Sequence, residues 1–126
     1  MKHYSRGQTL LELVIAIGVV AVIITGLVVA ATSSLRFGQE SRLRSSAVKY
    51  AQEAIELARQ MRDTQSWDTF MSYTGSGSQI EMRGPFTRTV TFTWNDPIMT
   101  VQSNVSWAVG ASQQTTQLQT YLTQWR

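Results

Sequence analysis

Nineteen consecutive uncharged residues near the N-terminus constrain this chain more than any other part of its sequence. They run from Leu13 to Ala31 and read LVIAIGVVAVIITGLVVAA, with only Gly18, Thr25 and Gly26 interrupting the aliphatic series. At about 1.5 Å per residue a helix of this length spans about 28 Å, close to the roughly 30 Å hydrocarbon core of a bilayer. The sequence therefore predicts one transmembrane helix.

The charges on either side of this run indicate its direction in the membrane. Lys2 and Arg6 precede it, and basic residues at that position favour an N-terminus that stays in the cytoplasm. The first charge after it is Arg36, and Arg42 and Arg44 beyond it argue weakly for the opposite orientation. We expect a single pass through the inner, cytoplasmic membrane, with the remainder of the chain outside.

Composition excludes several kinds of site. The chain of 126 residues has no cysteine and a single histidine, His3, so thiolate sites, disulfides and histidine-based metal or catalytic centres lack their residues. The net charge is +3, but residues 64–126 carry equal numbers of acidic and basic side chains. Basic and aromatic residues lie in different segments, which does not favour nucleic-acid binding. We predict no metal and no cofactor.

The one group of carboxylates that could suggest acid–base chemistry has a simpler interpretation. Glu53, Glu56 and Asp63 lie in a segment with helical periodicity, and basic residues stand near them in the sequence, namely Lys49, Arg59 and Arg62. Such neighbours predict ion pairs on a helix surface. We expect no catalytic residue and no enzymatic activity.

Three interpretations of the apolar run remain to be compared. A cleaved secretory signal peptide would have a shorter apolar region, of about 7 to 15 residues, ending at a small-residue cleavage site. A plain single-pass anchor explains the length and the flanking charges. It does not explain the acidic Glu12 directly beside the apolar run, where a carboxylate is costly. A precursor that is cut and then polymerises would explain it.

Residues 6–17, Arg-Gly-Gln-Thr-Leu-Leu-Glu-Leu-Val-Ile-Ala-Ile, resemble the N-terminal signature of type IV pilins and of the pseudopilins of type II secretion. The resemblance implies that a prepilin peptidase cuts the Gly7–Gln8 bond and methylates the new amine of Gln8. It also assigns Glu12, the fifth residue of the mature chain, to assembly, where its carboxylate would pair with the α-amine of a neighbouring subunit. The sequence departs from the usual pattern in having Gln8 in place of phenylalanine and no proline in the apolar helix.

Beyond the membrane the sequence predicts one small α+β domain. An apolar stripe at helical spacing continues from Leu43 to Met61, so the span and this stripe form one long N-terminal helix. Three alternating segments, residues 86–94, 99–109 and 115–125, predict a three-stranded antiparallel sheet packed on the outer half of that helix. Inward faces are expected at Val90, Phe92 and Trp94 and at Val101, Val105 and Trp107. The last segment alternates less cleanly, with Leu118 and Leu122 on one side and Tyr121 and Trp125 on the other, as expected if both faces are partly covered.

The predicted organisation has five segments: a basic leader (1–7), a transmembrane and filament-core helix (8–35), its amphipathic continuation (36–63), a glycine- and serine-rich loop (64–85) and the sheet (86–126). By the resemblance, the chain is a structural subunit of a type IV pilus or related filament on the cell surface. Its partners would be other pilin subunits, the prepilin peptidase, the assembly platform and motor, and membrane lipid before assembly. The alternatives are a minor pilin or pseudopilin, or a plain single-pass protein with a small external binding domain.

Overall fold

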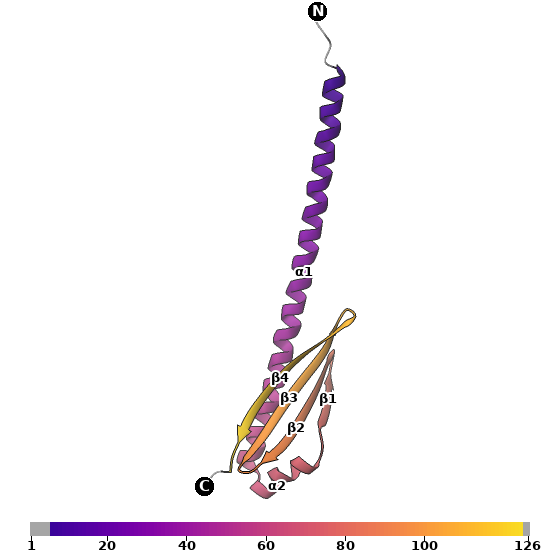
Figure 1. The fold of residues 1–126 in the computed structure, drawn as a ribbon. Coiled ribbons are helices and arrows are strands. Elements are labelled where there is room, and N and C mark those ends of the chain that lie inside the picture. Colours follow the sequence, from indigo (N-terminus) through magenta and orange to yellow (C-terminus); the bar gives the residue numbers. More distant parts are fainter. Residues whose placement is uncertain (1–5, 125–126) are drawn as a thin grey trace, which may run out of the picture. The chain divides into compact units, whose positions relative to one another are not determined.

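The computed structural model describes residues 6–124, and of residues 6–8 only the backbone. Its elements follow in chain order as α1 (Arg6–Thr64), α2 (Trp67–Met71), the 3-10 helix η1 (Ser72–Gly75), β1 (Gln79–Arg83), β2 (Phe86–Asn95), β3 (Ile98–Val109) and β4 (Ser112–Leu122) (Figure 1). The chain forms two compact units, Met1–Gln39 and Glu40–Arg126, and the division falls within α1.

The first unit is the apolar part of α1. Its described side chains are exposed, apart from the half-buried Ser33. Two of its threonines satisfy their hydroxyls within the helix, since Thr25 donates to the carbonyl of Ala21 at 2.8 Å and Thr32 donates to that of Val28 at 3.0 Å. A helix whose polar groups are satisfied internally is compatible with a hydrocarbon environment.

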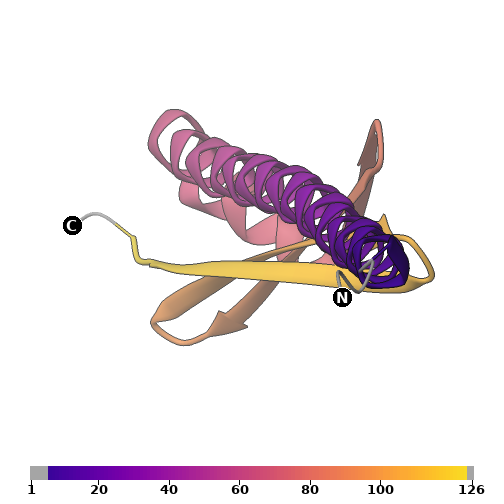
Figure 2. The ribbon, with the colours of Figure 1, turned by 90° about the horizontal axis from the view of Figure 1, so that it is seen from above.

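The second unit is built on the remaining part of α1. One side of this helix is buried, and it consists of the residues that the periodicity predicted: Ala47, Tyr50, Ala51, Ala54, Ile55 and Ala58. Leu43 and Met61 are partly buried at the two ends of the stripe. Four of the six buried residues are alanines, which allow a close approach of the helix to the sheet. Figure 2 shows this part of α1 on one side of the sheet.

The sheet is an antiparallel meander with the strand order β1-β2-β3-β4. The register opposes Val90 to Ser103 and Val101 to Thr120. Alternate residues turn to α1, and their burial confirms the predicted inward faces of β2 and β3, because Val90, Phe92, Val101, Val105 and Trp107 are buried and Trp94 is half-buried. In β4, Leu122 is buried and Leu118 half-buried, whereas Tyr121 is exposed on the opposite face, contrary to the expectation that both faces are partly covered. Trp125 lies outside the described residues.

The prediction of three strands was wrong, because the sheet has four. The additional strand, β1, lies within residues 64–85, where the sequence predicted a loop, and α2 and η1 lie there as well. Its sequence QIEMR does alternate polar and apolar residues, but over only five positions, and all five side chains are exposed, so no buried face distinguishes the segment from a loop. It is a strand because it pairs with β2, opposing Glu81 to Arg88 and Ile80 to Thr89.

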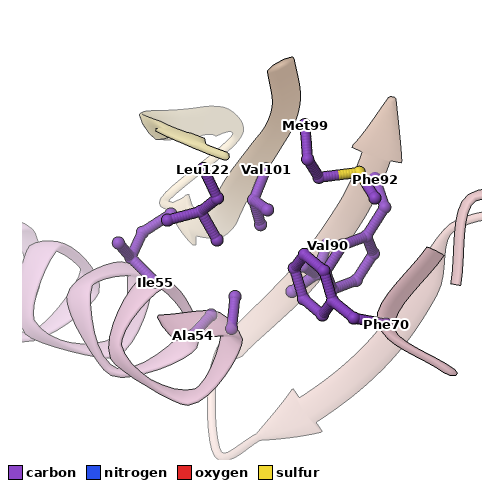
Figure 3. Packing of buried hydrophobic residues seen from close by; sticks show 9 residues of the cluster. Ala54, Ile55, Phe70, Val90, Phe92, Met99, Val101 and Leu122 are labelled. Atoms are coloured by element: carbon purple, nitrogen blue, oxygen red, sulfur yellow. The ribbon is translucent and has the colours of Figure 1, made fainter. Parts of the chain in front are cut away.

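The core has two neighbouring clusters. Figure 3 shows the larger, in which the fully buried Phe70 of α2 packs among α1 and the strands, with its ring centroid 6.1 Å from that of Phe92. Its buried members are Ala54, Ile55, Ala58, Phe70, Val90, Phe92, Met99, Val101 and Leu122. The smaller consists of Ala47, Tyr50, Ala51, Val105 and Trp107. The short α2 thus contributes Phe70 to the hydrophobic core of the second unit.

Candidate functional site

The predicted cleavage site lies at the start of α1. The helix begins at Arg6, so the backbone of Gly7 and Gln8 is in its first turn. Gln8 and Glu12 are four residues apart, which puts them about 6 Å apart along the axis and on the same side of the helix. Residues 1–5 of the predicted leader, with Lys2 and His3, lie outside the described residues.

Glu12 stands at the edge of the apolar run. Its side chain is exposed. No hydrogen bond or ion pair joins it to another side chain within residues 9–124. A carboxylate at the boundary of a bilayer costs a few kcal/mol unless it reaches headgroups or meets a cation. The α-amine created by a cut after Gly7 would be such a cation, at the end of a helix whose dipole already carries partial positive charge.

The apolar surface of α1 is continuous beyond Glu12. Among the described helices, α1 alone is long and apolar enough to cross a membrane, judged by length and composition. A shallow, open hollow on its surface is lined by Ala21, Val22, Thr25, Gly26 and Val29. A Cβ added at Gly18 or Gly26 would meet no atom within 4 Å. Small residues on an apolar helix let a second helix approach closely.

A charged cluster on the second unit holds β1 and β2 to α1. The buried Arg88 donates to the backbone carbonyl of Tyr50 at 2.9 Å, pairs with Glu81, and lies 4.0 Å from the centre of the Tyr50 ring. Arg83 forms a bidentate pair with Glu53, at 2.7 and 2.9 Å. The contacts with Glu53 and Tyr50 join residues 30 and 38 positions apart in the sequence.

The pKa values in this cluster follow from its contacts. The hydrogen bond from Arg83 holds the pKa of the Glu53 carboxyl below its ordinary value, and the same bond raises the pKa of Arg83. Burial raises the pKa of Tyr50, against the opposing effect of Arg88. The pKa shifts of Glu53, Arg83 and Tyr50 all lead away from neutral pH, and the contacts of these three side chains join β1 and β2 to α1.

Two of the predicted helix ion pairs are confirmed, since Arg59 pairs with Glu56 and Arg62 with Asp63, each at 2.7 Å. The prediction for Glu53 was wrong. Its partner is Arg83 of β1, because strand β1 brings the Arg83 guanidinium to the same side of the helix. Within the described part of the chain, no three His, Cys, Asp or Glu side chains are grouped so that they could hold a metal ion.

Residues 2–28 match the prokaryotic N-terminal methylation motif. This motif is the signature of type IV pilins and pseudopilins, and it implies prepilin-type cleavage and a pilin-like subunit. The proteins that carry it are structural, and it implies other pilin subunits and a prepilin peptidase as partners. The match covers residues 2–7 of the predicted leader and most of the apolar run, and it leaves the second unit unmatched. No curated protein and no solved structure matches the chain.

Proposed function

We propose that this chain is a structural subunit of a type IV pilus or a related filament, made as a membrane-inserted precursor. A prepilin peptidase cuts between Gly7 and Gln8 and methylates the amine of Gln8, and the mature chain then polymerises. The chain itself performs no catalysis. One observation carries the proposal: the methylation motif at residues 2–28 coincides with a helix whose apolar side chains no described part of the chain covers.

An exposed apolar helix must be surrounded by other apolar groups, and two different surroundings provide them, one before assembly and one after it. Before assembly, membrane lipid surrounds it, with the N-terminus in the cytoplasm and the second unit outside. After extraction by the assembly platform and its motor, the same helices of other subunits pack around it in the centre of the filament. The second unit has its own core, which supports a role as the folded part on the filament surface.

In the filament we assign Glu12 to subunit pairing. Cleavage leaves a positive amine on Gln8, one helical turn from Glu12 of its own chain. Helices that stack with a stagger of about one turn bring one subunit's amine to the next subunit's carboxylate. Both charges then leave water as a pair, which costs less than transferring either one alone.

The first experiment follows processing. Intact mass and N-terminal sequencing are measured for wild type, Gly7→Ala and Gly18→Ala, in cells with and without a prepilin peptidase. Gly18 is the matched control, because it is a glycine of the same helix with open space around it. We expect wild type and Gly18→Ala to begin at a methylated Gln8 when the peptidase is present, and Gly7→Ala to keep its leader.

An uncut wild-type chain in peptidase-positive cells would refute the proposal. A plain single-pass membrane protein with a small external binding domain would then be the better account. Cleavage that also occurs without the peptidase would point to ordinary secretory processing and would refute it as well.

The second experiment tests Glu12 separately from cleavage. Glu12→Gln keeps the shape of the side chain and removes its charge, and Glu40→Gln makes the same change at an exposed position of α1 outside the apolar run. We expect both variants to be cleaved, and the amount of sheared filament to fall strongly for Glu12→Gln alone. Normal filament yield from Glu12→Gln would show that the carboxylate is not needed for assembly.

A further inference from the structure

The outer edge of β4 carries no protecting residue of its own, although Arg59 of α1 donates to the Thr120 hydroxyl of this strand at 3.4 Å. Residues 112–122 contain no charged residue, no glycine and no proline. The pairing with β3 is regular from end to end, without a bulge. Within the described residues, none of the backbone hydrogen bonds outside the regular elements involves β4. Natural sheets usually protect such an edge with charges, proline or a bulge, since a bare edge pairs readily with another strand.

The opposite edge of the sheet is β1, and exposed apolar side chains lie on these two edge strands. Ile80 and Met82 of β1 are 67% and 77% exposed, and Tyr121 of β4 is 62% exposed. The register places all three on the face turned away from α1. On the central strands the same face carries mostly threonine, serine, asparagine and glutamine, for example Thr89 and Gln102.

The number of strands determines how these two edges can meet. In a meander of four antiparallel strands the first and the last run in opposite directions. Subunits of a filament are related by rotation about its axis and translation along it, which preserves the direction of each strand along that axis. The β4 edge of one subunit therefore meets the β1 edge of the next in antiparallel orientation. A sheet of three strands would have brought the two edges together in parallel.

We propose that β4 of one subunit pairs with β1 of the next, so that the sheets continue from subunit to subunit around the filament. In this register Tyr121 lies opposite the neighbour's Ile80, and Gln119 opposite its Met82. The exposed Tyr121 and Ile80 then cover each other across the new pair of strands, and Met82 meets the stem of Gln119. The contact is heterologous, and such contacts propagate into helical filaments instead of closing as dimers. This inference rests on the proposed function.

A disulfide can report this contact because the chain has no cysteine of its own. The test uses the full-length double variant Met82→Cys with Gln119→Cys, in filaments sheared from peptidase-positive cells and oxidised. Within one chain β2 and β3 separate the two strands by about 14 Å, and the register sets Gln119 four residues further along, so the two positions are about 20 Å apart. A disulfide needs Cα atoms closer than about 7 Å, so it can form only between subunits.

We expect a ladder of covalent multimers on a non-reducing gel, with the 82–119 linkage identified by mass spectrometry. The matched control is Met82→Cys with Gln113→Cys, which keeps the second cysteine on the same strand and face but moves it about 20 Å. The control should give no ladder. A ladder from both variants would overturn the proposed register.

The remaining outcomes separate this inference from the proposed function. Filaments that assemble without a ladder overturn the edge pairing and leave the pilin function standing. A 119–119 linkage alone shows a two-fold contact between β4 strands and also overturns the pairing. If the chain stays uncut and no filament forms, the proposed function fails, and the edge pairing fails with it.

A pair of charge variants provides a second readout. Gln119→Lys puts a charge on the β4 edge, and Gln102→Lys puts it on the directly opposed residue of β3. We expect Gln119→Lys to lower the temperature at which filaments dissociate and Gln102→Lys to leave it unchanged, since only the edge position lies in the proposed contact. Equal effects of the two lysines would contradict the pairing.

Discussion

Replacement of Phe70 by alanine tests whether α2 is held to the core as the structure describes. Phe70 is 0% exposed, and the ring centroids of Trp67, Phe92 and Tyr73 lie 5.6, 6.1 and 6.3 Å from its own. Truncating a buried phenylalanine to alanine costs about 3–5 kcal/mol through lost transfer energy and the cavity left behind. A small domain has a total stability of about 5–15 kcal/mol, so Phe70→Ala should remove a large share of it.

The assay is thermal and urea unfolding of the full-length protein in detergent, followed by tryptophan fluorescence. A loss of 3 kcal/mol in a unit of this size lowers Tm by about 12 °C or more. Phe37→Ala is the control, because Phe37 is 70% exposed on α1 and its truncation should change the stability by less than about 0.5 kcal/mol. A loss below about 1 kcal/mol for Phe70→Ala would refute the docking of α2 against the sheet.

Two further predictions concern a turn and an ion pair. Gly110 has φ +61° in the turn between β3 and β4, so Gly110→Ala should lower stability by about 1–2 kcal/mol, whereas Gly38→Ala within α1 should raise helix stability by about 1 kcal/mol. Thermal melts that shift in the same direction for both would contradict this. Because Arg83 lowers the pKa of Glu53, the stabilisation is present above the unfolded pKa and is lost as pH falls through the folded pKa. Between about pH 6 and pH 3, wild type should therefore lose more stability than Glu53→Gln, and parallel pH curves would contradict the assignment.

The sequence predicted the long elements correctly because their periodicity is repeated many times. The stripe from Leu43 to Met61 covers several helical turns, and the alternation in β2 and β3 extends over 10 and 12 residues. Errors at single positions do not change such a pattern. For the candidate site, the spacing of Gly7, Gln8 and Glu12 could be read directly from the sequence, and their roles remain a proposal supported by the motif match.

The short elements could not be predicted for a physical reason. Helix α2 has five residues, fewer than a stable isolated helix needs. It forms because Phe70 packs against Phe92 and the core residues of α1 and the sheet. Strand β1 has no buried side chain and depends on hydrogen bonds to β2 and on the pairs that Glu81 and Arg83 form with Arg88 and Glu53.

By itself, then, the sequence determined the uncharged apolar helix, the motif ahead of it, the helical stripe and three of the four strands, because each is encoded by neighbours along the chain. Tertiary structure alone decided the partner of Glu53, the burial of Phe70 and the presence of β1, because each depends on residues distant in sequence. The fourth strand also decides that the two edges of the sheet run in opposite directions, a property that no local pattern in the chain contains.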